Sequence, residues 1–395
     1  MQEKIKPLTT AEYYKQIGKN DKSSLINLSE RKPIDFIPSG SWVINSIIGD
    51  GTMQDKPGGF PRGHITEIFG DESSGKTTLA LSTVRECQKL GLPAVFLDYE
   101  YTFHPGYAQK LGIDLSKEKF ILYQPDHFQQ GARIIKDAFA IRPGIICVDS
   151  VSAMIPKEFL EGEIDEGGRI GLQAQLMSAF LAHITKYLKE SNVSLIFLNQ
   201  MRNVIQIQQG WSPKGQGPQE ESSGGKALRY YSSVRLKLNK GAVDRVDGIN
   251  VITGKKEKLP QNVSVYASVI KNKIDKPYKR APFYIKFAQG IDNIQSIIEL
   301  AVNLNVIKKS GAQYTFTVGK DTLFKVQGKR QVWDTLNTNE KIFSKLQERL
   351  IISEDKQIQE QYGKENEEDD MEAMLSNVAE SYIDKKKKQK EEPTE

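Results

Sequence analysis

Short apolar runs alternate with amphipathic stretches through the middle of the chain. The runs are rich in Ile, Val, Leu and Phe and end in polar residues, as buried strands do: Ile65–Phe69, Ala94–Asp98, Ile145–Asp149 and Ser194–Asn199. Stretches of helical periodicity lie between them, including Thr77–Leu90 and Gly171–Lys189. This alternation predicts an α/β fold with a mostly parallel, twisted sheet and right-handed crossovers.

Three later runs follow one another without intervening helices. They are Val234–Leu238, Val263–Ile270 and Phe283–Phe287. Their apolar and polar residues alternate more than in the earlier runs, which is typical of strands with one solvated face. We expect these strands to extend the same sheet in antiparallel fashion.

Composition divides the chain into four parts. Residues 1–38 are polar, residues 39–290 hold the predicted core, and residues 291–350 begin with a helical pattern and form a small C-terminal domain. Within the core, residues 161–171 and 202–225 are predicted loops, and a loop as long as the second is usually functional or disordered. Charge blocks from residue 351 to residue 395 predict a disordered tail.

Overall composition narrows the class of protein. Hydrophobic residues make up 38% of the 395 residues, and no apolar run reaches the ~18 residues of a membrane-spanning helix. The two cysteines, Cys87 and Cys147, are too few for a disulfide scaffold or a four-thiolate zinc module. No secretory signal is visible at the start of the sequence. We therefore expect a soluble, cytoplasmic protein with no membrane partner.

The formal net charge of +5 combines two opposite parts. Residues 364–395 carry 6 Lys and 11 acidic residues, a net charge of −5. The rest of the chain carries 49 Lys and Arg against 39 acidic residues, a net charge of +10. A basic body favours a polyanionic partner, and the acidic tail is predicted to compete with that partner.

One glycine-rich segment carries a specific phosphate-binding motif. The pattern G-x-x-x-x-G-K-[ST] stands between a predicted strand and a predicted helix, in the segment Gly70, Asp71, Glu72, Ser73, Ser74, Gly75, Lys76, Thr77 and Thr78. The glycines let backbone N–H groups wrap phosphates, and the helix N-terminus favours their charge. Lys76 would reach the β- and γ-phosphates, and the Thr77 hydroxyl would ligate Mg²⁺.

Two acidic residues extend this predicted site. Asp149 ends an apolar strand, which is where phosphate-transferring proteins of this kind place the acid that holds Mg²⁺. Glu100 follows the strand Ala94–Asp98, at the edge where open α/β sheets bind ligands. Glu100 is either the general base that activates water or a solvated loop acid, and the residues alone leave both interpretations open.

Seven further motifs stand in a fixed order along the chain. They are Phe-Leu-Asp-Tyr-Glu at Phe96–Glu100, Tyr-Ala-Gln-Lys-Leu-Gly at Tyr107–Gly112, Val-Asp-Ser-Val-Ser-Ala at Val148–Ala153, Glu-Gly-Glu-Ile at Glu161–Ile164, Leu-Ile-Phe-Leu-Asn-Gln-Met-Arg at Leu195–Arg202, Gly-Gly-Lys-Ala-Leu and Ser-Val-Arg-Leu within Gly224–Leu236, and Lys-Asn-Lys at Lys271–Lys273. With Gly70–Thr78, they resemble the RecA homologous-recombination ATPases over roughly residues 35–305.

The resemblance implies an overall architecture and a function. The architecture is a RecA-like P-loop ATPase core with a small N-terminal assembly segment and a small α+β C-terminal domain. The function is a DNA-dependent ATPase that forms helical filaments on single-stranded DNA and exchanges strands with homologous duplex DNA in recombination and repair. Mediator or single-strand-binding proteins are further partners that this function would involve.

The resemblance also implies roles at the nucleotide. ATP and Mg²⁺ would lie between neighbouring subunits, with Lys271 and Lys273 reaching the γ-phosphate from the second subunit. Tyr107 would stack on the adenine, and Gln200 would sense the γ-phosphate and signal to the second loop. Tyr230 would lie at the contact between subunits.

The two predicted loops fall where this family binds DNA. The residues assigned to DNA are Arg169 and Ile170 in the first loop, Arg202, Ile205 and Trp211 in the second, and Lys226 and Arg229 after it. Cations for phosphates and apolar or aromatic side chains for bases suit sequence-tolerant binding of single strands. A loop anchor is the alternative interpretation of Trp211, and a solvated charge is the alternative for Arg169.

Five positions depart from the family pattern. Gln208 and Gln209 stand in the longer second loop where the family has an apolar-aromatic wedge. His104 stands where the family has an acid near the adenine, and Gln175 and Ala182 stand where the helix after the first loop carries arginines. The family's contacts to the base and to DNA do not carry over to these positions.

Two other functions share parts of the pattern. A ring helicase or related motor would keep Lys76, Asp149 and Glu100, but it would not need the Glu-Gly-Glu-Ile and Gly-Gly-Lys-Ala-Leu segments together. A regulatory DNA-binding filament protein would not need Glu100 with both lysines. The complete set of motifs favours a recombinase.

Overall fold

The computed structural model describes residue 9 and residues 33–49, 58–162, 166–203, 220–222, 225–249 and 252–350. The chain divides into two compact units, Met1–Asp35 and Phe36–Glu395, and every element below belongs to the second. The predicted N-terminal segment, residues 1–38, lies outside the described residues except for residue 9 and residues 33–38. The predicted tail, residues 351–395, lies outside them entirely.

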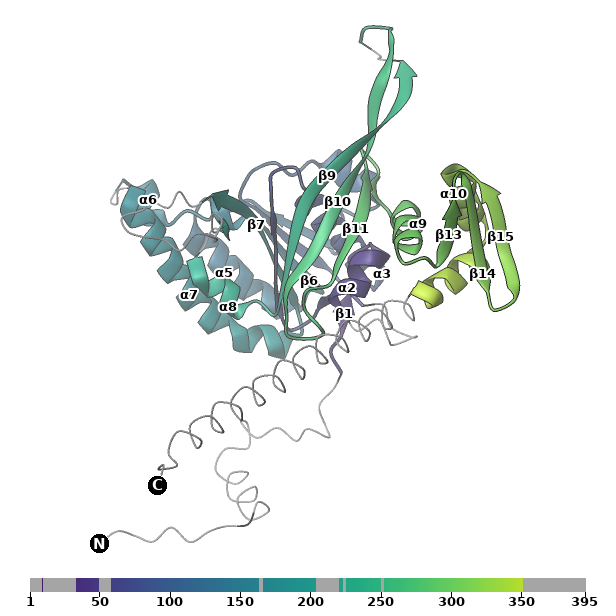
Figure 1. The fold of residues 1–395 in the computed structure, drawn as a ribbon. Helices are drawn as coiled ribbons and strands as arrows, with labels where there is room; N and C mark the ends of the chain where they lie inside the picture. The colour runs from purple at the N-terminus through teal and green to yellow at the C-terminus, as the bar shows by residue number, and fades with distance from the viewer. Residues whose placement is uncertain are drawn as a thin grey trace, which may run out of the picture. The chain divides into compact units, whose positions relative to one another are not determined.

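A large sheet forms the centre of the second unit (Figure 1). Six neighbouring strands run parallel in the order β9-β3-β7-β6-β4-β5. Their bounds are β3 Ile65–Gly70, β4 Ala94–Asp98, β5 Phe120–Tyr123, β6 Ile145–Asp149, β7 Ser194–Asn203 and β9 Val234–Ile249. The four apolar runs that predicted parallel strands are therefore confirmed, and their burial on both faces explains why they are continuously apolar.

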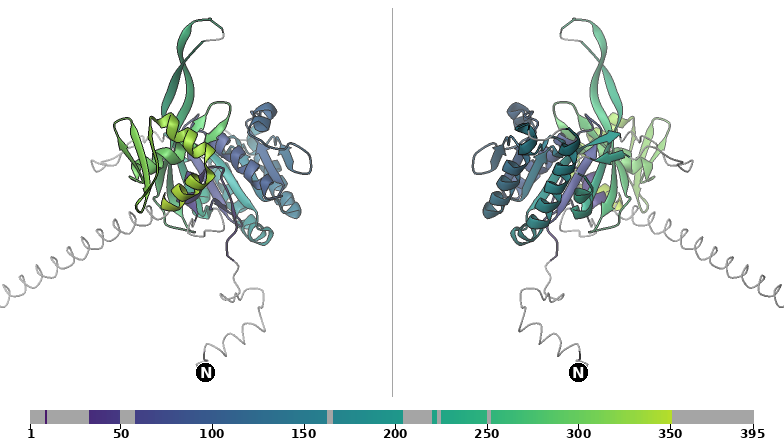
Figure 2. Two further views of the ribbon diagram at one scale, coloured as in Figure 1. Left: turned by 90° about the vertical axis from the view of Figure 1, so that its right-hand side faces the viewer. Right: turned by 90° about the vertical axis from the view of Figure 1, so that its left-hand side faces the viewer.

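The predicted antiparallel extension is confirmed for Val263–Ile270 and Phe283–Phe287. It is wrong for Val234–Leu238, because this run belongs to β9, which pairs with β3 in parallel fashion. β10 (Lys256–Asn272), β11 (Arg280–Lys286) and β12 (Gly290–Asp292) continue the sheet beyond β9, each antiparallel to its neighbour. β9 and β10 run much further than their apolar patterns predicted. Residues 240–249 and 256–262 of these two strands form a ribbon that rises beyond the rest of the sheet in the views of Figures 1 and 2. This ribbon is largely exposed, so its sequence carries no core pattern.

Helices cover both faces of the sheet, because the strand side chains alternate between two apolar clusters. Ile68, Phe96 and Ile196 pack with α2 (Trp42–Ile48) and α3 (Lys76–Lys89) in the first cluster. The second cluster joins the opposite strand face to three helices, α5 (Phe128–Ala138), α7 (Glu166–Ser191) and α8 (Gly225–Tyr231). The short helices α4 (Pro105–Lys110) and α6 (Lys157–Leu160) follow β4 and β6.

The structure corrects the boundaries of both predicted loops. The helix predicted to begin at Gly171 begins at Glu166, so residues 166–171 belong to α7 and not to the first loop. The pair Gly167-Gly168 had marked a helix break, but helix propensity is a weak signal that tertiary context overrides. In the second loop, β7 continues to Asn203 and pairs with β8 (Glu220–Ser222). Residues 204–219 lie outside the described part.

The C-terminal part has the predicted α+β content. β13 (Ile307–Ser310), β14 (Gln313–Val318) and β15 (Asp321–Gln327) form an antiparallel sheet. It follows α9 (Asn293–Asn303) and precedes α10 (Lys329–Thr338), and residues 340–350 are helical.

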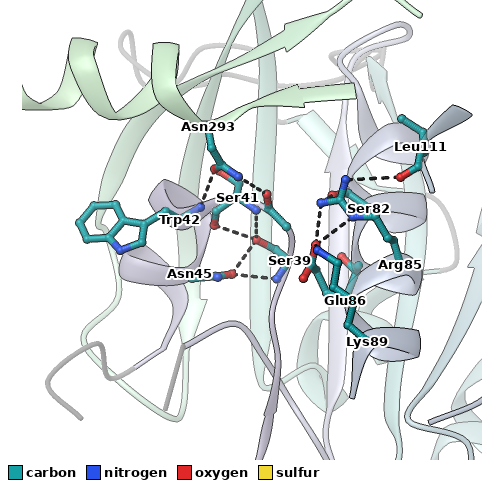
Figure 3. Close-up of polar contacts among 12 residues, drawn as sticks. Ser39, Ser41, Trp42, Asn45, Ser82, Arg85, Glu86, Lys89, Leu111 and Asn293 are labelled. Carbon is teal, nitrogen blue, oxygen red and sulfur yellow. Dashed lines mark hydrogen bonds and ion pairs between the residues drawn. The ribbon is translucent and has the colours of Figure 1, made fainter. Parts of the chain in front are cut away.

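Asn293, the first residue of α9, ties this helix to the start of the core. Its Nδ2 donates to the Gly40 carbonyl oxygen at 2.7 Å, and its Oδ1 accepts from the Trp42 N–H at 2.9 Å (Figure 3). In addition, the strand β1 (Phe36–Ile37) pairs with β2 (Phe60–Pro61). None of the helices in the described part of the chain is long and apolar enough to cross a membrane.

Candidate nucleotide-binding site

The predicted phosphate loop joins β3 to α3. Gly70 and Gly75 frame it with positive φ angles of 155° and 86°, and Gly75 is the N-cap of α3. A Cβ atom at Gly70 would lie 2.0 Å from the Leu238 carbonyl oxygen, and one at Gly75 would lie 2.3 Å from Ile285 Cδ1. Both positions therefore require glycine. Between them, Asp71, Glu72 and Ser73 are exposed, as expected of a turn at the surface.

Lys76 lies across this loop. Its Nζ donates to the carbonyl oxygens of Gly70, at 3.0 Å, and Asp71, at 2.7 Å. Burial lowers the pKa of Lys76, while the carboxylates of Asp149 and Glu100 act in the opposite direction. The Ser74 hydroxyl is buried without a hydrogen-bond partner in the same loop. A buried polar atom in a loop of backbone amides is a fitting place for the oxygens of a phosphate group.

Thr77 and Asp149 meet at the carboxyl edge of the sheet. The Thr77 hydroxyl donates to Asp149 Oδ2 at 2.8 Å, although the two residues are 72 positions apart. Burial raises the pKa of Asp149 to about 6, the neighbouring carboxylates of Glu100 and Asp98 raise it as well, and the Thr77 hydrogen bond and Lys76 oppose this shift. A hydroxyl and a carboxylate side by side form a hard-oxygen donor set that suits Mg²⁺.

Glu100 is held by two partners at the same edge. Ser150 Oγ donates to Glu100 Oε1 at 2.5 Å, and Gln200 Nε2 donates to that oxygen at 3.1 Å. Ser152 Oγ lies 2.7 Å from Ser150 Oγ. The predicted general base and the predicted γ-phosphate sensor are thus in direct contact, and an oriented carboxylate fits a group that must point at a water molecule. Sequence reasoning missed Ser150, although it follows Asp149 within a motif.

A pocket of about 440 Å³ opens beside the phosphate loop. Residues 73–78 and Tyr107 line one side, and the Tyr107 hydroxyl lies 3.1 Å from Thr78 Oγ1. His104 fixes Tyr107 by capping α4, because its Nδ1 accepts the Tyr107 N–H at 3.0 Å. The other side was not predicted: Val263, Ile285, Lys286, Phe287 and Ala288. These residues come from β10, β11 and the turn after β11, and no sequence motif marked these positions.

Lys271 and Lys273 lie at the other end of the sheet. Lys271 is paired in register with Arg235, near the amino end of β3, whereas Gly70 stands at its carboxyl end. Lys271 Nζ donates to the carbonyl oxygens of Arg229, at 2.6 Å, and Tyr230, at 3.1 Å, and Lys273 Nζ donates to that of Tyr230 at 3.3 Å. The two lysines cap the C-terminus of α8, so within one chain they do not join the phosphate loop.

The residues predicted to bind DNA are only partly described. Arg169 and Ile170 lie in the first turns of α7, and Arg202 lies near the end of β7. Lys226 and Arg229 are exposed on α8, as is Tyr230, the residue predicted at a subunit contact. Two further predictions, Ile205 and Trp211, fall outside the described residues. α7 and α8 are neighbours, so the described parts of both predicted DNA regions share one side of the sheet.

The strand–loop–helix phosphate motif, the Thr77–Asp149 contact and the parallel sheet define a P-loop nucleotide-binding protein. Comparison with known proteins narrows this class. The family described as RecA N-terminal domain matches residues 7–292. The chain belongs to the RecA family.

Relatives over most of the chain support the same assignment. Protein RecA of Rhodococcus opacus (strain B4) is 37% identical over 346 residues, covering 86% of this chain and 91% of its own. Protein RecA of Mycoplasmopsis pulmonis (strain UAB CTIP) is 36% identical and covers 89% and 94% respectively. Protein RecA of Francisella tularensis subsp. novicida (strain U112) is 39% identical and covers 76% and 77%.

Proposed function

We propose that this chain is a DNA-dependent ATPase that assembles on single-stranded DNA and catalyses homologous pairing and strand exchange. The observation that carries this proposal is the group at the carboxyl edge of the sheet. There the phosphate loop, the Thr77–Asp149 contact and the Glu100–Gln200 contact stand together in a member of the RecA family. The proposed location is the cytoplasm, and the further partners are single-strand-binding or mediator proteins.

The nucleotide would occupy the pocket beside the phosphate loop. The loop amides and Lys76 bind its phosphates, and Tyr107 packs against its base. Thr77 and Asp149 would hold Mg²⁺, which supplies positive charge to the phosphates when bound. Glu100 takes a proton from the attacking water, and Ser150 and Gln200 keep its carboxylate oriented.

The proposed assembly completes this site. Lys271 and Lys273 of the next subunit reach the phosphates, because these lysines lie at the edge of the sheet opposite to their own phosphate loop. DNA binds at the first turns of α7 and at the second predicted loop, residues 202–225, with Lys226 and Arg229 among its contacts. Nucleotide binding at subunit contacts then controls the DNA-binding state.

The decisive experiment is strand exchange between circular single-stranded DNA and homologous linear duplex, with and without ATP and Mg²⁺. We expect joint molecules only with ATP, Mg²⁺ and homology. The variant Lys76→Ala is expected to lose ATP hydrolysis, because the phosphates of ATP then lack the Lys76 ammonium group that binds them. Duplex unwinding without homology would identify a motor instead, and filaments that yield no joint molecules would identify a regulatory DNA-binding protein.

A further inference from the structure

A buried ionic network crosses the central strands β7, β3 and β9. Glu67 on β3 is fully buried, and its Oε2 accepts from Arg235 Nε on β9 at 2.5 Å. Its Oε1 accepts from Asn199 Nδ2 on β7 at 3.0 Å. The Arg235 guanidinium also lies 4.4 Å from the centre of the Phe69 ring. A carboxylate in the middle of an apolar parallel sheet has no role in the nucleotide site described above.

Stability does not explain this network. The cost of removing two charges from water offsets most of their attraction, and a buried ion pair often stabilises a protein no better than packed apolar side chains would. Such a pair does restrict the positions of its side chains, because each buried charged group needs its partner at hydrogen-bonding distance and few arrangements allow that. The structure therefore raises the question of which groups the pair holds in place.

One end of the network reaches the γ-phosphate side of the nucleotide site. Asn199, which Glu67 holds, accepts the backbone N–H of Gln200 at 2.9 Å through its Oδ1. Gln200 in turn donates to Glu100. The buried Glu67 carboxylate thus orients Asn199, and Asn199 in turn holds the backbone of Gln200, whose side chain contacts Glu100.

The other end reaches the two lysines at the opposite edge of the sheet. Arg235 is the strand partner of Lys271. Burial lowers the pKa of Lys271, and the cations of Lys273 and Arg235 lower it further, while Glu67 acts in the opposite direction. Lys271 and Lys273 bind the last carbonyl groups of α8, and this helix follows the second predicted DNA loop. Gln200 stands on β7, the strand that precedes the same loop.

We propose that Glu67 and Arg235 are positioning residues that couple Gln200 at a subunit's own nucleotide to the Lys271 and Lys273 pair that the same subunit offers to its neighbour. The lysines have two alternative sets of acceptors: their own α8 carbonyls, as observed, and the neighbour's phosphates. A displacement of Gln200 by nucleotide shifts Asn199, Glu67 and Arg235 in turn and changes which set the lysines prefer. The inference rests on the proposed function.

The test measures coupling between nucleotide and DNA. The affinity for a fluorescent single-stranded oligonucleotide is measured with and without a non-hydrolysable ATP analogue and Mg²⁺. The affinity for the analogue is measured with and without DNA, because coupling must be reciprocal. We expect about tenfold or greater coupling in the wild-type chain, a size usual for linked sites.

Three variants interrupt the network differently. Glu67→Gln combined with Arg235→Met removes both charges together, so no buried charge is left alone. Asn199→Ala keeps the ion pair and removes its link to Gln200. Arg235→Lys keeps a cation beside Glu67 but loses the planar contact with Phe69. We expect the first two to reduce the coupling to about twofold or less while the affinity for the analogue without DNA stays within about twofold. Arg235→Lys is expected to retain part of the coupling.

The matched control is Glu86→Gln on the outer side of α3. Glu86 accepts from Arg85 at 2.6 Å and from Lys89 at 3.0 Å, and Arg85 also donates to the Leu111 carbonyl oxygen at 3.4 Å (Figure 3). These partners belong to α3 and to the end of α4, and not to the three strands that carry the network. The variant Glu86→Gln is expected to keep full coupling.

A wild-type chain without coupling would overturn the proposed function. Wild-type coupling that persists in the first two variants would overturn the inference alone. Loss of analogue binding in both of these variants would show that the Glu67–Arg235 pair has only a structural role, and this result would also overturn the inference.

Discussion

Asp149 carries the most evident conflict between folding and function at the scale of single residues. Its carboxyl group is 5% exposed, lies near Glu100 and Asp98, and has a pKa raised to about 6. In the folded chain without bound ligands, the ionised form is therefore disfavoured relative to the unfolded chain. This cost to the stability of the folded chain is the price of keeping a buried carboxylate at the sheet edge, where it can bind a cation.

The first prediction concerns Asp149→Asn without nucleotide or Mg²⁺. Because the folded pKa lies above the ordinary value of 3.8, the contribution of Asp149 to stability is most favourable below pH 3.8 and is lost as pH rises through about 6. The substitution should thus raise the melting temperature more at pH 7.5 than at pH 5. At pH 7.5 the gain in the free energy of unfolding should be at most about 3 kcal/mol. Thermal melts of both chains at the two pH values check this. An equal or larger gain at pH 5 would contradict it.

Position in the sequence decided which site residues could be predicted. Lys76 and Thr77 stand in the glycine-rich motif that follows the run Ile65–Phe69, and Asp149 ends an apolar run. Glu100 and Gln200 follow such runs within a residue or two, so the convergence of these residues on one edge follows from parallel strands. Glu67 stands inside the apolar run Ile65–Phe69, and its partner Arg235 is 168 positions away. No local pattern links the two, because the contact depends on which strands become neighbours.

At the scale of elements, the turn between β3 and α3 depends on contacts with a strand from the second half of the core. The carbonyl oxygen of Leu238 on β9 occupies the space that a side chain at Gly70 would need. β9 can therefore pack beside β3 only if residue 70 of the phosphate loop is glycine. The glycine is thus required by the sheet as well as by the loop.

Gly70→Ala tests that dependence. The added Cβ would meet the Leu238 carbonyl oxygen at 2.0 Å with φ at 155°, so we expect a loss of about 2 kcal/mol or more in stability and loss of nucleotide binding. Gly91→Ala is the matched control, because its φ is 75° but no atom lies within 4 Å of the new Cβ. It should cost only about 1 kcal/mol. Chemical unfolding and nucleotide titration measure both, and equal effects would contradict the steric explanation.

The elements that sequence patterns missed share a physical cause. The pattern of buried apolar residues predicted β3, β4, β6 and β7, because those strands are covered on both faces. It missed β5, whose residues are half exposed, and it placed the start of β9 in the antiparallel part. It ended β9 at Leu238, where the core ends, although backbone pairing continues to Ile249. It also missed the start of α7 at Glu166, since the glycine pair there resembles a loop signal. Backbone hydrogen bonds and tertiary packing extend elements where side-chain patterns carry no information.

At the scale of the whole molecule, the proposed nucleotide site is divided between the two edges of the sheet. The phosphate loop lies at the carboxyl edge of the parallel strands, and Lys271 and Lys273 lie at the amino edge. A head-to-tail contact, which repeats without closing, would bring the second edge of one copy to the first edge of the next. Hydrolysis would then require assembly.

A mixing experiment tests this division. Lys76→Ala and the double variant Lys271→Ala/Lys273→Ala are each expected to be inactive alone. In an equal mixture that assembles at random, about one head-to-tail contact in four unites an intact loop with intact lysines, so ATP hydrolysis should partly return. Hydrolysis is measured on single-stranded DNA. A mixture as inactive as its components would show that the lysines do not act between subunits.

The ribbon of residues 240–249 and 256–262 has features that discourage unwanted strand pairing between molecules. β3 accompanies β9 only as far as Leu238, and β11 accompanies β10 only from Asn262, so the outer edges of the ribbon have no further strand beside them in the described part of the chain. Open edges invite the strands of other molecules, and charged residues, proline and bulges discourage them. Lys256, Lys258 and Pro260 lie on this stretch, with a bulge directly after Pro260. The two lysines, the proline and the bulge therefore disfavour the addition of strands from other copies of the chain at these open edges.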